Sequence, residues 1–105
     1  MAISARRMQI EEMLRTDPAD AFLRYALAME WVGEGNDTEA ARVFEQIRVD
    51  TPDYVPTYFQ NAQVLIRLGD GANAHAVLQK GIEIARKAGD FHAAGEMDGL
   101  LAGIG

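Results

Sequence analysis

The sequence repeats itself at an interval of 34 residues, so that the stretch from Pro18 to Thr51 is followed by a second copy that begins at Pro52. Residues of the same class recur at this spacing. The matched pairs are Pro18 and Pro52, Tyr25 and Phe59, Ala28 and Ala62, Val32 and Ile66, Gly35 and Gly69, Ala40 and Ala74, Val43 and Val77, and Phe44 and Leu78. A repeat of this length is typical of stacked helical units, in which each unit buries its apolar face against the next one.

The first copy contains the signals of two helices joined by a short turn. Asp17 can accept the free amide hydrogens at a helix start, and Pro18 suits the first turn because its missing amide hydrogen would have no partner there. We therefore expect a helix over residues 18–33 and a turn at Gly33, Gly35 and Asn36, where glycine supplies the left-handed conformation that ends a helix. Asn36 then occupies the first position of a capping box and predicts the start of the second helix.

The first of these helices is apolar on more than one side. One stripe contains Phe22, Tyr25, Met29 and Val32. The other stripe contains Leu23, Leu27 and Trp31. A helix that packs against one neighbour needs only one apolar stripe, so we expect the other stripe to meet a further element or a ligand.

The second copy follows the same order but departs from it at several positions. We expect a helix that reaches Leu68, a turn at residues 69–71 and a helix over residues 72–88. Asn61 stands where the first copy has Leu27. An amide at a helix interface is costly unless it is hydrogen-bonded, so we interpret Asn61 as a buried, satisfied amide. A hydrogen bond from Asn61 to a ligand is the alternative.

Each end of the chain carries one further amphipathic segment. Residues 3–15 place Met8, Ile10, Met13 and Leu14 at helical spacing. Residues 90–102 do the same with Phe91, Ala94, Met97 and Leu101. We interpret both segments as capping helices, because the ends of a stack of repeats need one apolar face and one polar face.

The repeat resembles the tetratricopeptide signature of leucine and a small residue, an aromatic residue, alanine, an aromatic residue and proline. The residues that carry this resemblance are Leu27, Ala28, Trp31, Ala40, Phe44 and Pro52. The resemblance implies an all-α, tetratricopeptide-like α-solenoid of antiparallel helix pairs. We expect a single domain over residues 1–105, with a capping helix at 3–15, repeats at 18–51 and 52–88, and a C-terminal capping helix at 90–102.

In that family, the first helices of successive repeats line a concave groove that holds a peptide or a helix. The resemblance places seven residues in this groove, with Pro56 as a further neighbour. They are Phe22, Tyr25, Met29, Val32, Phe59, Gln63 and Ile66. Exposed aromatic area of this kind can anchor an interface. The alternatives are that a terminal helix folds back and fills the groove, or that the stripe is ordinary core.

One known function of the family can be tested on the sequence. Members that hold chaperone C-termini use a clamp of lysine, asparagine and arginine for two carboxylates, since paired anions need several charge-assisted donors. The first two clamp positions are Tyr25 and Met29 in this chain. The sequence therefore disfavours the binding of chaperone tails and favours a hydrophobic or amphipathic helical ligand.

The composition narrows the class of partner. The net charge of -6 makes this an acidic protein and argues against binding of nucleic acid, which needs a clustered positive surface. The chain has no cysteine, so no disulfide framework points to an oxidising compartment. No segment approaches the roughly 20 apolar residues of a membrane span. We expect a cytoplasmic protein that does not insert into a membrane.

Candidate sites for metal binding and catalysis are weak. His92 and Glu96 lie one helical turn apart, but two ligands alone are a poor metal site. Glu30, Glu34 and Asp37 cluster around a glycine turn, which is usually wet, whereas general acid–base catalysis needs carboxylates in a desolvated cleft. The sequence contains no nucleophile elbow and no phosphate-binding loop. We expect no metal, no cofactor and no enzymatic activity.

The function that the sequence favours is protein–protein interaction through a concave apolar groove, with another protein or a peptide as the partner. The alternative is a scaffold or assembly subunit that forms a homodimer through the same apolar surface. Self-association is plausible on physical grounds, because fewer than about three stacked repeats are marginally stable alone.

Overall fold

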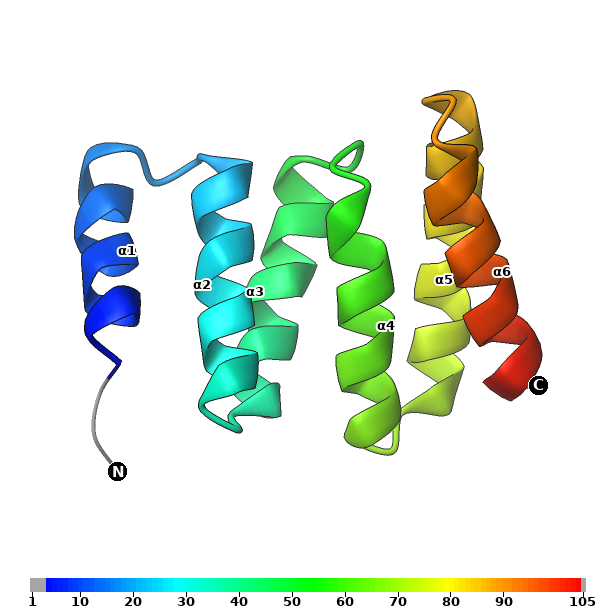
Figure 1. Ribbon diagram of the computed structural model, residues 1–105, viewed down its shortest axis with the longest axis horizontal. Coiled ribbons are helices and arrows are strands. Elements are labelled where there is room, and N and C mark those ends of the chain that lie inside the picture. Colours follow the sequence, from blue (N-terminus) through cyan, green and yellow to red (C-terminus); the bar gives the residue numbers. More distant parts are fainter. Residues whose placement is uncertain (1–3, 105) are drawn as a thin grey trace.

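The computed structural model describes residues 4–104, which form six α-helices and no strand. The helices are α1 (Ala5–Thr16), α2 (Ala21–Gly33), α3 (Asp37–Asp50), α4 (Pro56–Arg67), α5 (Gly71–Lys87) and α6 (Phe91–Ile104). Figure 1 shows them side by side in chain order, with successive helices running in opposite directions. The prediction of an all-α helical repeat fold is confirmed.

Helices pack mainly against their neighbours in the chain. The largest contacts join α2 to α3, α4 to α5 and α5 to α6, while α3 also packs on α4 and α1 on α2. The domain is consequently elongated, with extents of 37 × 28 × 20 Å. A contact between α4 and α6 brings the first helix of one pair beside the helix that follows that pair. This arrangement is that of an α-solenoid.

The turn inside each helix pair has the same geometry in both copies. Gly35 and Gly69 have φ values of 78° and 80°, which lie in the left-handed region where glycine is favoured. The amide of Asn36 then donates to the carbonyl of Trp31 at 2.9 Å, and the amide of Asp70 to that of Leu65 at 2.8 Å. Left-handed glycine therefore ends α2 and α4 in the same way.

Polar side chains at these turns also begin the next helices. The Asn36 side chain accepts a hydrogen bond from the amide of Glu39 at 3.1 Å. The Asp70 side chain accepts one from the amide of Asn73 at 3.2 Å. Both bonds satisfy amides that a helix start leaves without a partner. The predicted helix start after Asn36 is confirmed.

The predicted start of the first long helix at Pro18 is wrong. The helix α2 begins at Ala21, and Asp20 is its cap because its side chain accepts from the amide of Leu23 at 2.8 Å. Pro18 lies in the turn that precedes the cap. Pro56 is the first residue of α4, where a missing amide hydrogen leaves no bond unmade.

The terminal helices differ from the predicted segments by one to two residues. The helix α1 covers residues 5–16 rather than 3–15, and Ile3 falls outside the described residues. The helix α6 covers residues 91–104 rather than 90–102. Helix ends of this kind depend on the local cap. In α6 the cap is Asp90, whose side chain accepts from the amide of Ala93 at 3.1 Å.

The core consists of two clusters, one within each part of the solenoid. Ala28 and Ala40 are fully buried, and their small side chains allow α2 and α3 to cross closely. The second cluster joins α4, α5 and α6 around Tyr58, Leu78 and Met97. Burial of these apolar side chains stabilises the stack by about 1.5–3 kcal/mol for each fully buried large residue.

Candidate peptide-binding surface

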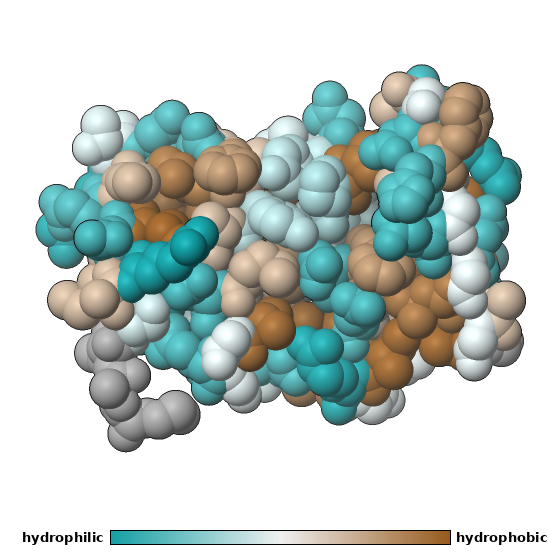
Figure 2. All heavy atoms as spheres, in the orientation of Figure 1, coloured by the Kyte–Doolittle hydropathy of each residue, from teal (hydrophilic) through white to brown (hydrophobic). Residues whose placement is uncertain are grey.

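The helices α2, α4 and α6 form one layer of the domain, in front of α3 and α5 (Figure 1). The predicted groove residues all come from α2 and α4 of this front layer. Apolar surface gathers on this face between α4 and α6 toward the C-terminus (Figure 2). The half-buried side chains that pack against the second core cluster include Ile66, Leu100, Leu101 and Ile104.

A hollow of about 250 Å³ opens on this layer between α2, the start of α4 and α6. Tyr25 and Phe59, which are equivalent in the two copies of the repeat, both line it. The remaining lining residues are Val55, Pro56, Gln60, Asp90, His92, Ala93, Glu96 and Met97. The helix α6 therefore forms one wall of the hollow and does not fill it.

Tyr25 packs against two other aromatic residues at this hollow. Its ring lies 6.0 Å from that of Phe44 and 5.8 Å from that of Tyr54, both in tilted arrangements that aromatic pairs favour. Burial raises the pKa of the Tyr25 hydroxyl, with a smaller effect of Tyr54 in the same direction. The phenol is therefore neutral at physiological pH and keeps its hydroxyl hydrogen for donation.

The other predicted groove residues lie outside the hollow. Met29 and Val32 are half-buried against the first core cluster, further along α2 from Tyr25. Gln63 and Ile66 are half-buried at the equivalent positions of α4. Phe22 is 66% exposed at the start of α2. The structure thus brings Tyr25 and Phe59 together and spreads the remaining residues along two neighbouring helices.

Solved structures with this arrangement identify the family. The solution NMR structure of a tetratricopeptide repeat domain protein from Salinibacter ruber matches with a TM-score of 0.80 and 34% sequence identity, over 84% of this chain and 89% of that chain. The chain belongs to the tetratricopeptide repeat family. A crystal structure of a Salinibacter ruber tetratricopeptide repeat domain protein gives a TM-score of 0.78 at 33% identity, over 81% of this chain and 94% of that one.

A more distant protein shares the fold of this tetratricopeptide repeat domain. The solution structure of a protein from Bordetella parapertussis matches with a TM-score of 0.82 at 20% identity, over 97% of this chain and 89% of that chain. Neither a family model nor a curated protein matches the sequence. Membership of the family makes protein–protein interaction the general function of the domain, on a fold that is typically a non-catalytic scaffold.

The tetratricopeptide repeat domain carries acidic groups at the rim of its hollow. Asp90 and Glu96 line it together with His92, whereas no lysine or arginine is among its lining residues. His92 Nε2 lies 3.3 Å from Glu96 Oε1, and both side chains are largely exposed. Within residues 4–104 no group of three or more potential ligands could hold a metal ion. This histidine and glutamate form a surface pair beside the hollow.

The helix α6 is the part of the site that sequence reasoning missed. The predicted stripe on this segment is correct for Ala94 and Met97, which are buried, and wrong for Phe91, which is 71% exposed because it is the first residue of α6. A capping helix was expected to cover the end of the stack, and that expectation does not place Ala93 and Glu96 in one hollow with Phe59. The sequence signal that could have indicated this wall was the presence of two acidic residues, Asp90 and Glu96, on the predicted C-terminal helix.

The three carboxylates near the first glycine turn each face an arginine. Glu34 pairs with Arg7 at 2.6 Å, and Glu30 lies 3.5 Å from Arg6. Asp37 pairs with Arg67 at 2.9 Å, and the hydrogen bond from this arginine lowers the pKa of the Asp37 carboxyl. These groups form separate ion pairs that tie neighbouring helices together.

In the part of the chain described here, no helix has the length and apolar character to cross a membrane.

Proposed function

We propose that this tetratricopeptide repeat domain binds an amphipathic helix or an extended peptide of another protein across α2 and α4. An apolar side chain of the ligand enters the hollow between Tyr25, Phe59 and α6. The observation that carries the proposal is that these two aromatic residues, 34 positions apart, line one hollow of about 250 Å³. Pockets that accept an anchor side chain are the usual centre of a protein interface.

Beyond the hollow, the ligand follows the half-buried side chains of the two helices. Met29 and Val32 on α2, with Gln63 and Ile66 on α4, continue the same faces at helical spacing. An amphipathic helix offers apolar residues at matching intervals, which is how helices are read in apolar grooves. Phe22 extends the surface at its outer end.

The charge around the hollow selects among apolar ligands. Because Asp90 and Glu96 line it and no lysine or arginine does, a ligand with lysine or arginine beside its apolar anchor gains a complementary contact. Such rim charges act mainly on the association rate, which falls as salt is added. An acidic ligand, such as a peptide that ends in paired carboxylates, meets repulsion at the same place.

Isothermal titration of a partner recovered from the native cell lysate tests the proposal. The Tyr25→Ala, Phe59→Ala double variant should weaken binding by at least about 2 kcal/mol, the usual loss for a central aromatic anchor. Tyr25 also packs on Phe44, so Phe59→Ala alone provides a second variant with a smaller effect on the core. Val49→Ala is a matched control, because Val49 is a 69% exposed apolar residue on α3. Unchanged affinity of the double variant would rule out this surface.

Self-association through the same apolar surface is the second candidate. The two most exposed aromatic residues, Phe22 and Phe91, are 66% and 71% exposed and lie at the starts of α2 and α6. Burial of both in a dimer would remove apolar area from water. Light scattering over an about hundredfold dilution separates the candidates, since a dimer dissociates by mass action and a persistent monomer excludes self-association.

A catalytic role is not part of this proposal. General acid–base chemistry needs two carboxylates with separated pKa values in one dry cleft, whereas the carboxylates of Glu34 and Asp37 are each paired with an arginine. The chain has no cysteine and therefore no disulfide that would indicate an oxidising compartment, and the location that we propose is the cytoplasm.

A further inference from the structure

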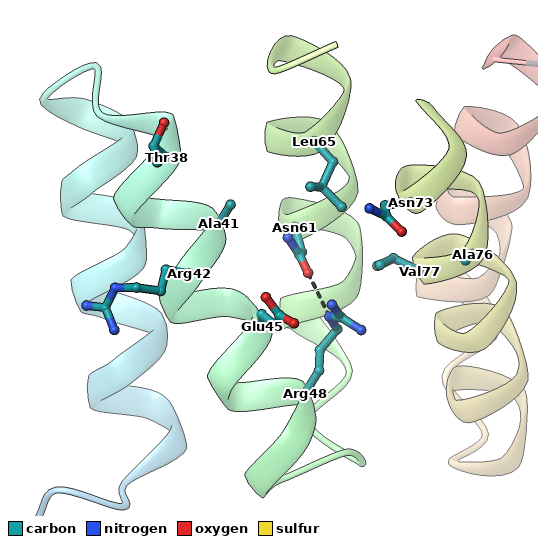
Figure 3. A pocket seen from close by; sticks show the side chains of 10 residues that line it. All are labelled: Thr38, Ala41, Arg42, Glu45, Arg48, Asn61, Leu65, Asn73, Ala76 and Val77. Carbon is teal, nitrogen blue, oxygen red and sulfur yellow. Dashed lines mark hydrogen bonds between the residues drawn. The ribbon is translucent and has the colours of Figure 1, made fainter. Parts of the chain in front are cut away.

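A second pocket lies on the other layer of the domain, between α3 and α5, with α4 at its floor (Figure 3). Its volume is about 410 Å³, larger than that of the Tyr25 hollow. The lining residues are Thr38, Ala41, Arg42, Glu45, Arg48, Asn61, Leu65, Asn73, Ala76 and Val77. It shares no residue with the proposed peptide surface.

Arg48 differs from every other basic residue within residues 4–104. All the other lysines and arginines lie in ion pairs with carboxylates. These pairs join Arg6 to Glu30, Arg7 to Glu34, Arg15 to Glu12, Arg24 to Asp50, Arg42 to Glu39, Arg67 to Asp37, Arg86 to Asp98, and Lys80 and Lys87 to Glu83. Arg48 is half-buried and forms an ion pair with none of the described carboxylates, in a chain that carries 16 acidic residues.

The partner of Arg48 is a neutral amide. Its Nε donates to Oδ1 of Asn61 at 2.7 Å, and Asn61 is only 1% exposed. The prediction that Asn61 is buried is confirmed, and this bond satisfies its side-chain oxygen. A half-buried guanidinium beside a neutral amide keeps a positive charge that an approaching anion can complement.

The bond to Asn61 also fixes how the guanidinium is presented. Because Nε is held, the plane of the group is set, and its two terminal nitrogens make no hydrogen bond to any described residue. Figure 3 shows this guanidinium extending from α3 toward the floor of the pocket. Two parallel donors at the end of a fixed guanidinium match the two oxygens of a carboxylate.

The other residues of the pocket determine which chemical groups a ligand can carry beside its carboxylate. Glu45 lines the pocket and forms no ion pair with Arg48 or with any other described residue. It would repel an isolated anion and accept a hydrogen bond from an N–H group. Arg42 is already paired with Glu39. Leu65 and Val77 supply apolar wall for a short side chain.

We propose that this pocket binds an α-carboxylate flanked by an N–H group, the chemistry shared by the C-terminus of a peptide and a free amino acid. The terminal nitrogens of Arg48 bind the carboxylate, and Glu45 accepts the N–H. Asn61 is a positioning residue that holds the guanidinium in place. The pocket is large enough for one or two residues of a peptide.

Heteronuclear NMR of the isotope-labelled domain tests this assignment with three small probes. N-acetylglycine carries both groups, N-acetylglycine methylamide lacks the carboxylate, and glycine carries a free ammonium. We expect N-acetylglycine to shift the side-chain resonances of Arg48 and Asn61 with saturation at about 1–10 mM. The methylamide should leave them unshifted. Tighter binding of glycine than of N-acetylglycine identifies a free amino acid, and the reverse order identifies a peptide C-terminus.

Variants separate a specific site from general charge attraction. Arg48→Gln should weaken N-acetylglycine at least about tenfold, the effect of losing hydrogen bonds to a charged group. Arg42→Gln removes a positive charge from the same pocket and should change the affinity less than about twofold. Asn61→Leu, which introduces the residue of the first copy, should also weaken binding and covers the case in which Arg48→Gln does not fold. Shifts that never saturate, equal shifts with the methylamide, or equal effects of Arg42→Gln and Arg48→Gln would each overturn the proposal.

Discussion

The close contact between α4, α5 and α6 depends on Gly81, which has no Cβ atom. A Cβ atom at Gly81 would lie 2.6 Å from Sδ of Met97 and 2.6 Å from Cβ of Tyr58. Both neighbours are buried, and the Cβ of Tyr58 cannot move without its backbone. Gly81→Ala should therefore force α5 away from α4 and from α6, although it adds only one methyl group.

The magnitude follows from two opposing effects. Overpacking of a filled core costs about 1–3 kcal/mol, and two contacts this short place Gly81 at the upper end of that range. Alanine in place of glycine gains about 1 kcal/mol of helix stability. The net loss for Gly81→Ala is then about 2 kcal/mol. At about 4 °C per kcal/mol for a domain of this size, the melting temperature should fall by about 8 °C.

Gly99 provides the matched control on α6. It is exposed, and a Cβ atom there would meet nothing within 4 Å. Gly99→Ala should thus keep the helix gain and raise the melting temperature by about 4 °C. Thermal unfolding followed by far-ultraviolet circular dichroism measures both variants. If Gly81→Ala were as stable as Gly99→Ala, the close packing of α5 on α4 and α6 would be incorrect.

Two further predictions concern ion pairs. The Arg7 guanidinium lies 4.1 Å from the ring centre of Trp31 and 2.6 Å from Glu34. Arg7→Ala should therefore loosen α1 and shift the fluorescence of Trp31 to the red. An unchanged spectrum would show that α1 does not depend on this contact. Because Arg67 lowers the pKa of Asp37, the ionised carboxyl stabilises the fold above the usual aspartate pKa, and this contribution is lost as the pH falls through the lowered value. Asp37→Asn should therefore flatten the acid side of the melting temperature against pH, and a profile like that of the native domain would contradict this assignment.

The sequence predicts the helical repeat because its signals are local and occur twice. Left-handed glycine at Gly35 and Gly69, and the capping side chains that follow each of them, depend only on nearby backbone. The predicted helix start at Pro18 was wrong because it, too, depended on local signals alone. Two candidate caps lie close together, and a single sequence does not reveal that Asp20, rather than Asp17, accepts the first amides of α2.

The candidate sites were only partly predictable because they depend on contacts between distant residues. The repeat spacing places Tyr25 and Phe59 on the same face, but the wall that Glu96 supplies exists only because α6 packs beside α4. The departure from the repeat at Asn61 was visible, whereas its donor, Arg48, lies on another helix at no characteristic spacing. A sequence does not show which arginines form ion pairs, so Arg48 could not be distinguished from the paired arginines before the structure was known.

The most direct test of the peptide surface is a map of amide shifts in the NMR spectrum of the domain when a captured partner peptide is added. We expect the largest shifts at Tyr25, Phe59, Ala93 and Glu96, which line the hollow, with smaller shifts along α2 and α4. Shifts confined to α3 and α5, with the hollow unaffected, would contradict the proposed function.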